Sequence, residues 1–395
     1  MSGRVLIIVQ NLSVPSDRRV WLECRALVGA GREVSVICPM GKGDGAYEHL
    51  EGVHIYRYPP PPPTKSTASF VYEFLYCWLR TLWLALRIRR RHGFDVIQAC
   101  NPPDTFFALA WLFKPFGARF VFDQHDLCPE VYESRFEEPS RPILRALRLL
   151  ERLTYLTADE VISTNESYRE VALRRGHKAP EHVTVVRTGP DTSVLEAGPP
   201  EPSLRRGRAH LCCYLGVMGP QDGVDLAIRA AHCYVRTLGR EDCTFVMMGG
   251  GDSYHDLVEL VGELGMEDYV FLPGRVSDAD LFAHLSTADL GLSSDPLNPL
   301  NDVSTMNKTM EYMAFGLPVV AFDLKETKVS AGDAARYVPP NDVEAYAGAI
   351  AELLDDPPRR AAMGRAGRER AETVLDWSRQ APAYLDVYRR VLDRG

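Results

Sequence analysis

The 395-residue sequence predicts an α/β protein with two doubly wound, parallel-sheet domains that face each other across a cleft. Three observations lead to this fold class. The length exceeds what one hydrophobic core usually holds, so two domains are expected. Short apolar runs alternate with amphipathic stretches in both halves, which is the pattern of parallel sheets covered by helices. A segment rich in Pro and Gly, EAGPPEPSLRRGR at 196–208, separates the halves as a linker would.

The predicted elements follow in chain order. In the first half the predicted strands are RVLIIVQ at 4–10, EVSVICP at 33–39, VHIYRYP at 53–59, FDVIQAC at 94–100, ARFVFDQHD at 118–126 and ADEVISTN at 158–165. Helical spacing between them predicts helices such as 18–30 and 103–113. In the second half the predicted strands are LCCYLGVM at 211–218, CTFVMMGGG at 243–251, YVFLPGRV at 269–276, LGLSSD at 290–295, LPVVAFD at 317–323 and AARYVPP at 334–340.

These elements set the predicted domain boundaries. We predict a first Rossmann-like domain over 1–196, a linker over 197–208 and a second Rossmann-like domain over 209–375. A C-terminal helix over 376–395 could cross back to the first domain. Because open parallel sheets bind ligands beyond the carboxyl ends of their strands, we expect the functional residues in the strand-to-helix turns.

Charge and cysteine content narrow the class of protein. The net charge is −8, yet the first half concentrates arginines, namely Arg80, Arg87, Arg89, Arg90, Arg91, Arg135, Arg141, Arg145, Arg148 and Arg152. No nucleic-acid motif accompanies them and the overall acidity opposes that partner, so none is predicted. Nine scattered cysteines without a C-x-x-C pair argue against disulfides and a zinc site. The apolar run at 5–9 is too short for a signal peptide, so we expect a cytoplasmic protein.

The segment NDVSTMNKTMEYMAFGLPVVAFD at 301–323 carries the strongest candidate site. Apolar residues recur there at helical spacing and predict a buried stripe of Met306, Met310, Met313 and Leu317. Asp302 or Ser304 is expected to cap the helix. The helix start, with Asn307 and the ammonium of Lys308, would suit a phosphate or diphosphate. The alternative is a surface pair between Lys308 and Glu311, three residues apart.

Three further turns of the second half have ligand-binding character. Gly216 and Gly219 follow a strand and would let the backbone approach a ligand closely. Gly250 lies in a triple glycine after the next strand, and Arg275 and Val276 lie in the strand-end loop that follows. Each turn could bind an anion or could be only a tight turn.

The first half offers its own candidates. Arg18 and Arg19 fall in the first turn of a helix that Ser16 or Asp17 would cap, where cations oppose the helix dipole. An anionic ligand would explain them, and two solvated arginines are the alternative. Asn11 also follows a strand and joins this set of predicted acceptor or cleft residues.

A second turn of the first half contains His125, Asp126 and Glu130 after the strand at 118–126. The group could supply a base, a metal ligand or a hydrogen-bonding clamp, or could only cap the following segment. No further ligand lies at a familiar spacing, so no metal is predicted. Asn101, after the strand at 94–100, completes the predicted set.

The sequence resembles the family 4 glycosyltransferases of the GT-B fold along essentially its whole length. The most specific part is EYMAFGLPVV at 311–320, which resembles the family signature E-x-M-A-x-G-x-P-V-V. The resemblance implies that Glu311 bonds the nucleotide ribose and that Arg275 and Val276 lie next to the base. It also implies that His125 lies near the transferred sugar and that the first domain binds the acceptor.

The sequence departs from this family at the donor diphosphate. Val217 and Asp222 stand where the family usually has an Arg and a Lys, and Val303 stands where the first Glu of its E-x7-E pattern would be. We therefore expect Lys308 to supply the missing cation, with Arg18 or Arg19 reaching across the cleft.

The resulting hypothesis is a retaining, metal-independent glycosyltransferase without a cofactor. It would move a sugar from a nucleotide-diphosphate donor to a hydroxyl acceptor, either a lipid-linked or polysaccharide precursor or a secondary metabolite. Electrostatic stabilisation of the leaving diphosphate would be the main task, with Lys308 as a catalytic residue and His125 or Asp126 positioning the sugar. A nucleotide-sugar 2-epimerase and a non-catalytic pseudo-glycosyltransferase partner are the alternatives, and a two-domain sugar sensor is disfavoured by the absent signal peptide.

The segment FVYEFLYCWLRTLWLAL at 70–86 precedes the basic run RIRRRHG at 87–93. It is short and interrupted for a membrane-spanning helix. An apolar helix next to a basic cluster is typical of an interfacial anchor on an anionic membrane, and a core helix is the alternative. We therefore predict peripheral association with the inner face of the cell membrane.

Overall fold

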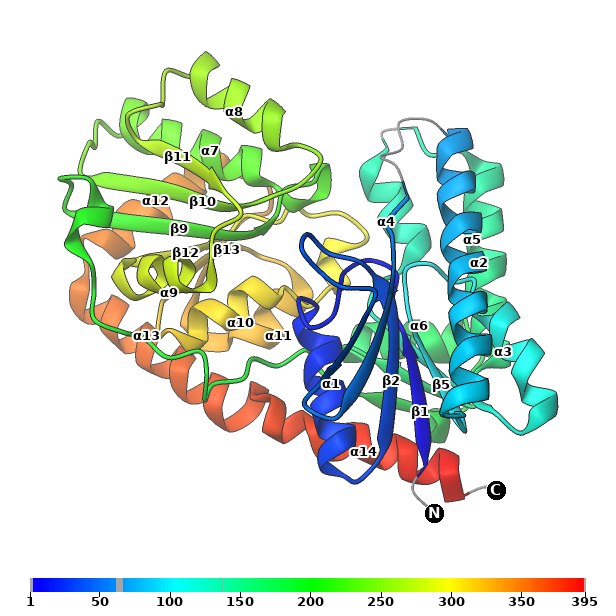
Figure 1. The fold of residues 1–395 in the computed structure, drawn as a ribbon. Helices are drawn as coiled ribbons and strands as arrows, with labels where there is room; N and C mark the ends of the chain where they lie inside the picture. The colour runs from blue at the N-terminus through cyan, green and yellow to red at the C-terminus, as the bar shows by residue number, and fades with distance from the viewer. Residues whose placement is uncertain (1–2, 62–66, 137, 394–395) are drawn as a thin grey trace. The chain divides into compact units, whose positions relative to one another are not determined.

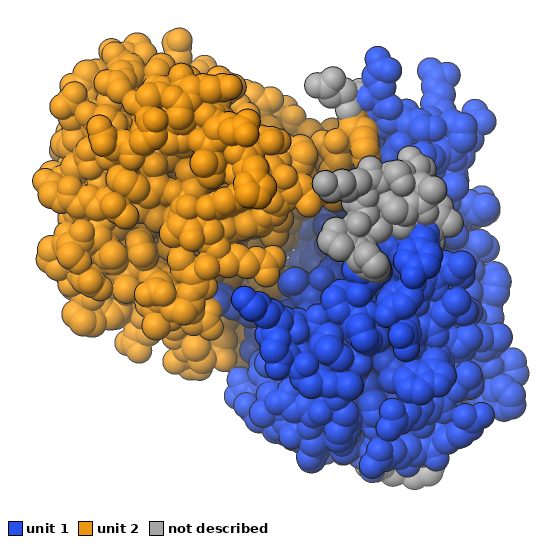
Figure 2. Space-filling model, turned by 45° about the horizontal axis from the view of Figure 1, so that its top comes forward, with its two compact units in different colours: residues 1–133, 138–187, 380–395 blue, residues 134–137, 188–379 orange. Residues whose placement is uncertain are grey.

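The computed structural model describes residues 3–61, 67–136 and 138–393, and side chains of the long helix that starts at residue 67 from residue 72 onward. The chain forms two compact units, coloured separately in Figure 2. Unit 1 comprises residues 1–133, 138–187 and 380–395, and unit 2 comprises residues 134–137 and 188–379. Both are α/β units with a largely parallel sheet, which confirms the predicted fold class.

Unit 1 contains an eight-stranded sheet in the order β3-β4-β2-β1-β5-β6-β7-β8. Its strands are β1 (Arg4–Ile8), β2 (Glu33–Pro39), β3 (Tyr47–Leu50), β4 (Val53–Tyr58), β5 (Val96–Cys100), β6 (Arg119–Gln124), β7 (Glu160–Ser163) and β8 (Val183–Val185). All neighbouring pairs are parallel except β3 with β4. The central strand β1 is almost fully buried, which explains its unbroken apolar sequence.

Helices cover both faces of this sheet. They are α1 (Arg18–Gly29), α2 (Thr67–Arg91), α3 (Phe107–Phe113), α4 (Cys128–Arg135), α5 (Arg141–Thr157), α6 (Glu166–Arg174) and the C-terminal α14 (Trp377–Asp393), with 3-10 turns η1 (Lys114–Phe116) and η2 (Pro180–His182). Side chains of α2, α3 and α5 share one hydrophobic cluster with Ile97 and Ala99 of β5, so these helices cover the same face (Figure 1). Gln98, between them in sequence, points to the opposite face and contacts α14.

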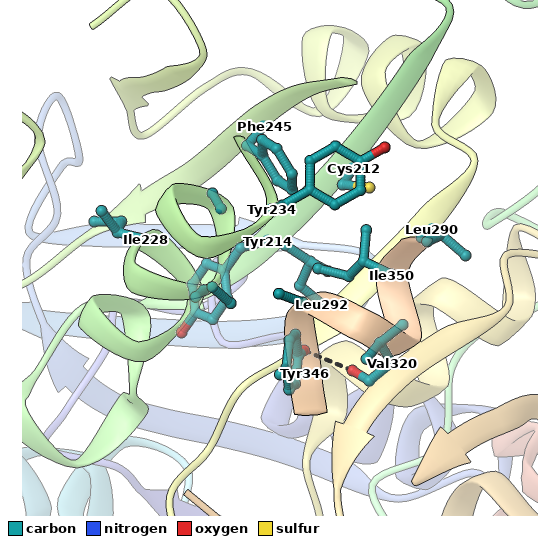
Figure 3. Close-up of a cluster of buried hydrophobic side chains, with 14 of the residues drawn as sticks. Cys212, Tyr214, Ile228, Tyr234, Phe245, Leu290, Leu292, Val320, Tyr346 and Ile350 are labelled. Carbon is teal, nitrogen blue, oxygen red and sulfur yellow. Dashed lines mark hydrogen bonds between the residues drawn. The ribbon is translucent and has the colours of Figure 1, made fainter. Parts of the chain in front are cut away.

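Unit 2 contains a six-stranded sheet in the order β11-β10-β9-β12-β13-β14, with every neighbouring pair parallel. Its strands are β9 (His210–Val217), β10 (Cys243–Gly250), β11 (Val270–Gly274), β12 (Leu290–Ser293), β13 (Val319–Phe322) and β14 (Ala335–Val338). One of its hydrophobic cores contains Tyr214, Tyr234, Phe245 and Ile350 (Figure 3). The hydroxyl of Tyr346 donates to the Val320 carbonyl at 2.7 Å, so this buried phenol has its polar atom satisfied.

The helices of unit 2 connect these strands. They are α7 (Val224–His232), α8 (Tyr254–Glu263), α9 (Asp278–Thr287), α10 (Asn307–Ala314), α11 (Lys325–Ala331), α12 (Val343–Leu354) and α13 (Pro357–Arg370). Shorter turns are η3 (Pro202–Arg205), η4 (Pro220–Asp222), η6 (Asn301–Val303) and η7 (Gly332–Ala334), and π-helical segments are η5 (Cys233–Thr237) and η8 (Ala371–Leu375). The C-terminal α14 begins in unit 2 and continues in unit 1 from residue 380.

Every strand predicted from the sequence is present, generally with shorter ends. The prediction missed β3 and β8, because β3 is a mostly exposed edge strand without an apolar run and β8 has only 3 residues. The predicted cap Asp17 is confirmed, since its side chain accepts from the Val20 N–H at 3.1 Å.

The predicted caps of α10 are wrong. Met306 is the N-cap residue and has no side-chain cap. Asp302 instead accepts from the Lys325 N–H at 2.9 Å, and Ser304 donates to the Leu300 carbonyl at 2.8 Å. Asp302 lies in the 3-10 turn η6 and Ser304 directly follows it, so both precede the helix. The helix therefore starts later than these capping residues predicted.

Candidate functional site

In unit 2, the neighbouring strands β9 and β10 end in glycines whose backbones lie very close together. Gly216 has φ +148° and Gly249 has φ +147°, a region that favours glycine. A Cβ on Gly249 would lie 1.8 Å from the Gly216 carbonyl oxygen, so a larger residue there would force the strand ends apart. The glycines therefore allow a compact carboxyl edge on which side chains from other turns gather.

Lys308 reaches this edge from the first turn of α10. A Cβ on Gly216 would lie 3.3 Å from the Lys308 Cε, and the Lys308 Nζ lies 4.8 Å from the centre of the Tyr214 ring. The ammonium donates to Asp295, just beyond β12, at 2.6 Å, and the two side chains are only 9% and 2% exposed. The alternative of a surface pair with Glu311 is therefore wrong for Lys308.

The charge of Lys308 is fixed by its surroundings. Burial by itself would lower the pKa of Lys308, but Asp295, Tyr214 and Asp222 outweigh burial and the pKa is raised. The residue is therefore an ammonium at any physiological pH. Burial raises the pKa of Asp222, against the opposing effect of Lys308.

Asp222 has a structural role in its own loop. Its carboxylate accepts from the Gly219 N–H at 2.8 Å and closes the turn η4. Gly219 is buried, and this contact occupies its amide. Asp222 stands where the family usually has a lysine, and here it stabilises its own glycine loop through a hydrogen bond to the main chain.

The remaining predicted residues of unit 2 are Gly250 at the end of β10, Arg275 and Val276 after β11, and Asn307 and Glu311 in α10. A Cβ on Gly250 would lie 3.6 Å from the Cγ of Arg275, so these two loops are in contact. Arg275 and Asn307 are exposed and Glu311 is half-buried. Val276 packs against the hydrophobic cluster that contains Met310 and Met313.

In unit 1, a buried carboxylate organises the end of β6. Asp123 is fully buried and accepts hydrogen bonds from Arg19 at 2.9 Å, from Gln98 at 3.0 Å and from His125 at 2.7 Å. Burial would raise the pKa of Asp123, but Arg19 and His125 outweigh it and hold the pKa well below its usual range. Asp123 is therefore an anion that three different elements orient.

This arrangement indicates which tautomer of His125 is present. The Nε2 atom lies 2.7 Å from Asp123 Oδ2 and 3.2 Å from Arg19 Nε, and it cannot donate to the first and accept from the second at once. The shorter contact to a carboxylate favours a proton on Nε2. Nδ1 is then the ring nitrogen that Asp123 and Arg19 leave unoccupied, on a side chain that is 17% exposed.

A second layer of buried groups supports the Asp123 network. Gln98 donates to Glu23 at 2.7 Å, and its carbonyl oxygen accepts from the hydroxyls of Tyr384, at 2.8 Å, and Tyr388. Burial and the charge of Asp123 raise the pKa of Glu23 well above its ordinary value, although Arg19 opposes them. The buried site therefore disfavours the ionised form of Glu23 beside Asp123.

Asn101 holds the loop that carries His125 and Asp126. Its side-chain oxygen accepts from the N–H of His125 at 2.7 Å and of Asp126 at 3.1 Å, and its amide donates to the Asp126 carbonyl at 2.8 Å. Glu130 lies apart from these contacts in an ion pair with Arg175 at 2.5 Å. Asn101 thus acts as a clamp on the loop.

The two arginines at the start of α1 have different surroundings. Arg18 is exposed, whereas Arg19 is 6% exposed and also donates to the Val186 carbonyl at 3.0 Å. The alternative of a solvated arginine is therefore wrong for Arg19, whose carboxyl contacts are Asp123 at 2.9 Å and Glu23 at 3.1 Å. Asn11 is exposed beyond the end of β1.

One group of side chains has donor atoms close enough to hold a metal ion. Within the described part of the chain, ligand atoms of Cys100, Asp123 and His125 lie within 4.8 Å of one another. Burial raises the pKa of the Cys100 thiol well above its ordinary value, and the Arg19 guanidinium already contacts Asp123. A protonated thiol and an adjacent cation both disfavour a divalent metal, so the group fits a hydrogen-bonded network better. No spacing of these residues along the chain could have predicted this group.

Comparison with known proteins gives the class of this protein. The description "Glycosyl transferase 4-like domain" matches residues 16–189, and "Glycosyl transferases group 1" matches residues 209–356. A D-inositol 3-phosphate glycosyltransferase of Thermobispora bispora is 28% identical over 301 residues, covering 72% of this chain and 68% of the relative. The fold and these matches define an enzyme of the GT-B glycosyltransferase class.

Solved structures agree with this class at the level of the fold. Sucrose-phosphate synthase from Thermosynechococcus elongatus aligns with a TM-score of 0.80 at 19% identity and covers 100% of both chains. Anabaena HepE in complex with UDP-glucose aligns with a TM-score of 0.73 at 16% identity, over 98% of this chain and 99% of that one. The chain belongs to family 4 of the glycosyltransferases, as the resemblance in its sequence predicted.

Proposed function

We propose that this glycosyltransferase takes its sugar from a nucleotide-diphosphate donor, retains the anomeric configuration and needs neither a metal nor a cofactor. The observation that carries the proposal is the buried ammonium of Lys308 beside the Gly216 backbone. Support for the donor class comes from HepE, which binds UDP-glucose and has the same fold. A relative that acts on D-inositol 3-phosphate supports a hydroxyl acceptor.

Lys308 suits the neutralisation of a leaving diphosphate. Among the described residues its ammonium has one hydrogen-bond partner, Asp295, which leaves donor capacity on a group that carries three N–H bonds. The first turn of α10 adds main-chain N–H groups that no side chain caps. Because the ammonium is held in place before the donor arrives, little reorganisation is needed when charge develops.

On unit 1, we propose that His125 and Asp126 contact the transferred sugar. The lone pair on His125 Nδ1 can accept a hydrogen bond from a sugar hydroxyl, while Asp123 holds the ring through Nε2. No carboxylate nucleophile is required when the acceptor attacks from the same face as the leaving group. The metal-independent mechanism is supported by the Arg19 guanidinium, which occupies Asp123 in the only group of ligand atoms found among the described residues.

We further propose a lipid-linked or polysaccharide-precursor acceptor and a cytoplasmic enzyme that works at the inner face of a membrane. In the part of the chain that is described, no helix is long and apolar enough to cross a membrane. The peripheral location has its own support in unit 1, given below.

Donor binding tests the proposal first. Thermal unfolding should be measured with UDP-, GDP- and dTDP-sugars, because a ligand that binds the folded state raises the apparent stability. We expect one nucleotide class to raise Tm for the wild type and for Lys328→Ala, a matched control whose lysine pairs with Asp323 on the surface. Lys308→Ala should lose the rise, and equal shifts in both variants would remove Lys308 from the donor site.

The reaction products test the remaining parts. With the selected donor and an acceptor panel, NMR of the product should show the donor's anomeric configuration, and activity should survive EDTA. A C2-epimer formed without acceptor would replace the transferase proposal by the epimerase alternative, and an inverted product would exclude retention.

A further inference from the structure

One face of α2 presents large apolar side chains to solvent. They recur at helical spacing, and their exposed fractions are 54% for Tyr72, 56% for Leu75, 51% for Leu79, 55% for Trp83 and 39% for Leu86. The opposite face is buried in the unit 1 core through Cys77, Leu84, Ala85 and Ile88. Single exposed apolar residues are normal, but an aligned stripe indicates an interaction surface.

Neighbouring elements extend this apolar character. Phe116, which is 70% exposed, follows α3, and its carbonyl accepts from Arg89 of α2 at 3.0 Å. Trp111, which is 50% exposed, donates to Thr157 at the end of α5 at 2.9 Å. On α5 itself, Leu149 and Leu156 are 57% and 62% exposed. We name the exposed sides of α2, α3 and α5 the basic-apolar face.

The same face is strongly basic in a chain of net charge −8. Its exposed arginines are Arg80, Arg87, Arg90 and Arg91 on α2 and Arg141, Arg145, Arg148 and Arg152 on α5. Among the described side chains of these helices the acids are Glu73, which is half-buried, and Glu151, which is buried and bound to Arg175. Only Arg148 of these eight has an ion pair within the described residues, a 3.5 Å contact with Glu133.

Arginine beside Trp, Tyr and Leu on a solvent-exposed helix matches the interface of an anionic bilayer. Aromatic rings lie at the headgroup level, aliphatic side chains enter the acyl boundary, and guanidinium groups attract acidic lipids. A second copy of this chain would bring two basic faces together. Nucleic acid could contact the arginines and the aromatic rings, but it would not bury the leucine stripe.

We propose that the basic-apolar face docks unit 1 on an anionic lipid bilayer, with α2 lying along the membrane surface. This deepens the proposed peripheral location and does not depend on the identity of the donor. From Tyr72 to Arg90 the helix is about 27 Å long at ~1.5 Å per residue, so the contact is an extended one. The core-helix alternative describes one face of α2, which is buried in unit 1. The proposed membrane contact uses the other face, which is exposed.

Vesicle flotation with the full chain tests the proposal. We expect binding to phosphatidylcholine vesicles that contain phosphatidylglycerol, weakened by salt, and little binding to phosphatidylcholine alone. The triple variant Arg145→Gln/Arg148→Gln/Arg152→Gln should reduce partitioning roughly a hundredfold, at ~fivefold for each arginine. Leu75→Ser/Leu79→Ser/Trp83→Ser should also release the protein. Arg89 stays unchanged because its guanidinium donates to the carbonyls of Phe94 and Phe116.

Matched controls come from unit 2. Arg229→Gln/Arg365→Gln/Arg379→Gln removes the same charge, and Leu238→Ser/Val258→Ser/Val374→Ser removes exposed apolar side chains, and none of these residues belongs to the basic-apolar face. These controls should float like the wild type. Equal losses in face and control variants, or no flotation at all, would overturn the proposal.

Two other outcomes would replace the bilayer by a different partner. Binding to single-stranded RNA without flotation would assign the face to nucleic acid. A dimer in sedimentation that Leu75→Ser/Leu79→Ser/Trp83→Ser dissolves, again without flotation, would assign it to a second copy. The donor-induced rise in Tm should persist in every face variant, so failure of the docking proposal and failure of the donor site remain distinguishable.

Discussion

The carboxyl ends of the two sheets each place a buried aspartate beside a cation, yet the two arrangements differ in how many groups they engage. In unit 1, Asp123 accepts from three side chains on three elements, and a further layer of buried groups supports them. In unit 2, Asp295 holds Lys308 beside glycine loops. The first arrangement fixes the orientation of a ring, and the second leaves a cation with donor capacity for a ligand. The difference separates a network that orients a ring from the proposed donor-binding site.

The largest expected effect concerns the stability of unit 1. Asp123→Ala removes the carboxylate that Arg19, Gln98 and His125 share, and it should lower the free energy of unfolding by about 3–5 kcal/mol, measured by urea denaturation. The control Asp323→Ala breaks an exposed pair with Lys328 and should cost less than about 1 kcal/mol. Equal losses in the two variants would contradict the central role of Asp123.

The next effect concerns catalysis by unit 2. Lys308→Met should lower kcat/KM by roughly 10²–10³-fold, the scale for loss of one preorganised charge donor, while Lys328→Met should not. Because Lys308→Met leaves Asp295 buried and unpaired, the double variant Lys308→Met/Asp295→Asn separates folding from catalysis. It should recover stability but not rate, and recovery of both would show that the ammonium acts only on the fold.

A smaller effect is a pH dependence in unit 1. Burial raises the pKa of Asp104 from 3.8 to about 6, although Cys128 and Asn101 oppose the shift. Between these two pH values the folded state binds more protons than the unfolded state, so Asp104 makes stability fall as pH rises. Asp104→Asn removes this dependence. The free energy of unfolding of the variant, relative to that of the wild type, should therefore rise by about 2 kcal/mol from pH 4 to pH 7. Parallel stability curves would contradict the raised pKa.

The smallest effect compares one buried hydroxyl from each unit. Tyr388→Phe removes a donor to Gln98, and Tyr346→Phe removes the donor to the Val320 carbonyl. Each should cost about 1 kcal/mol of stability. Only Tyr388→Phe should also change the NMR chemical shifts of the His125 ring, because Gln98 connects α14 with Asp123. Unchanged chemical shifts of the ring would limit Tyr388 to packing.

The sequence was sufficient for most strands because they are nearly continuous apolar runs, and it missed only the exposed β3 and the short β8 of the described strands. It also located Lys308 and the glycine turns, since each directly follows or precedes a recognisable element. Asp295 closes a predicted strand and could have been found by the same reasoning. Asp123 and Gln98 could not, because they lie inside strands and their partners are far away in the chain. Tyr384 and Gln98, for example, are 286 positions apart.

The C-terminal helix has a consequence for the synthesis of the protein. Tyr384 and Tyr388 donate to the side-chain carbonyl of Gln98, so residues synthesised 286 and 290 positions later complete the interior of unit 1. The polar interior of unit 1 therefore stays incomplete until α14 has been synthesised. A gene truncated before α14 should therefore yield an insoluble product, even though it encodes every strand of both sheets.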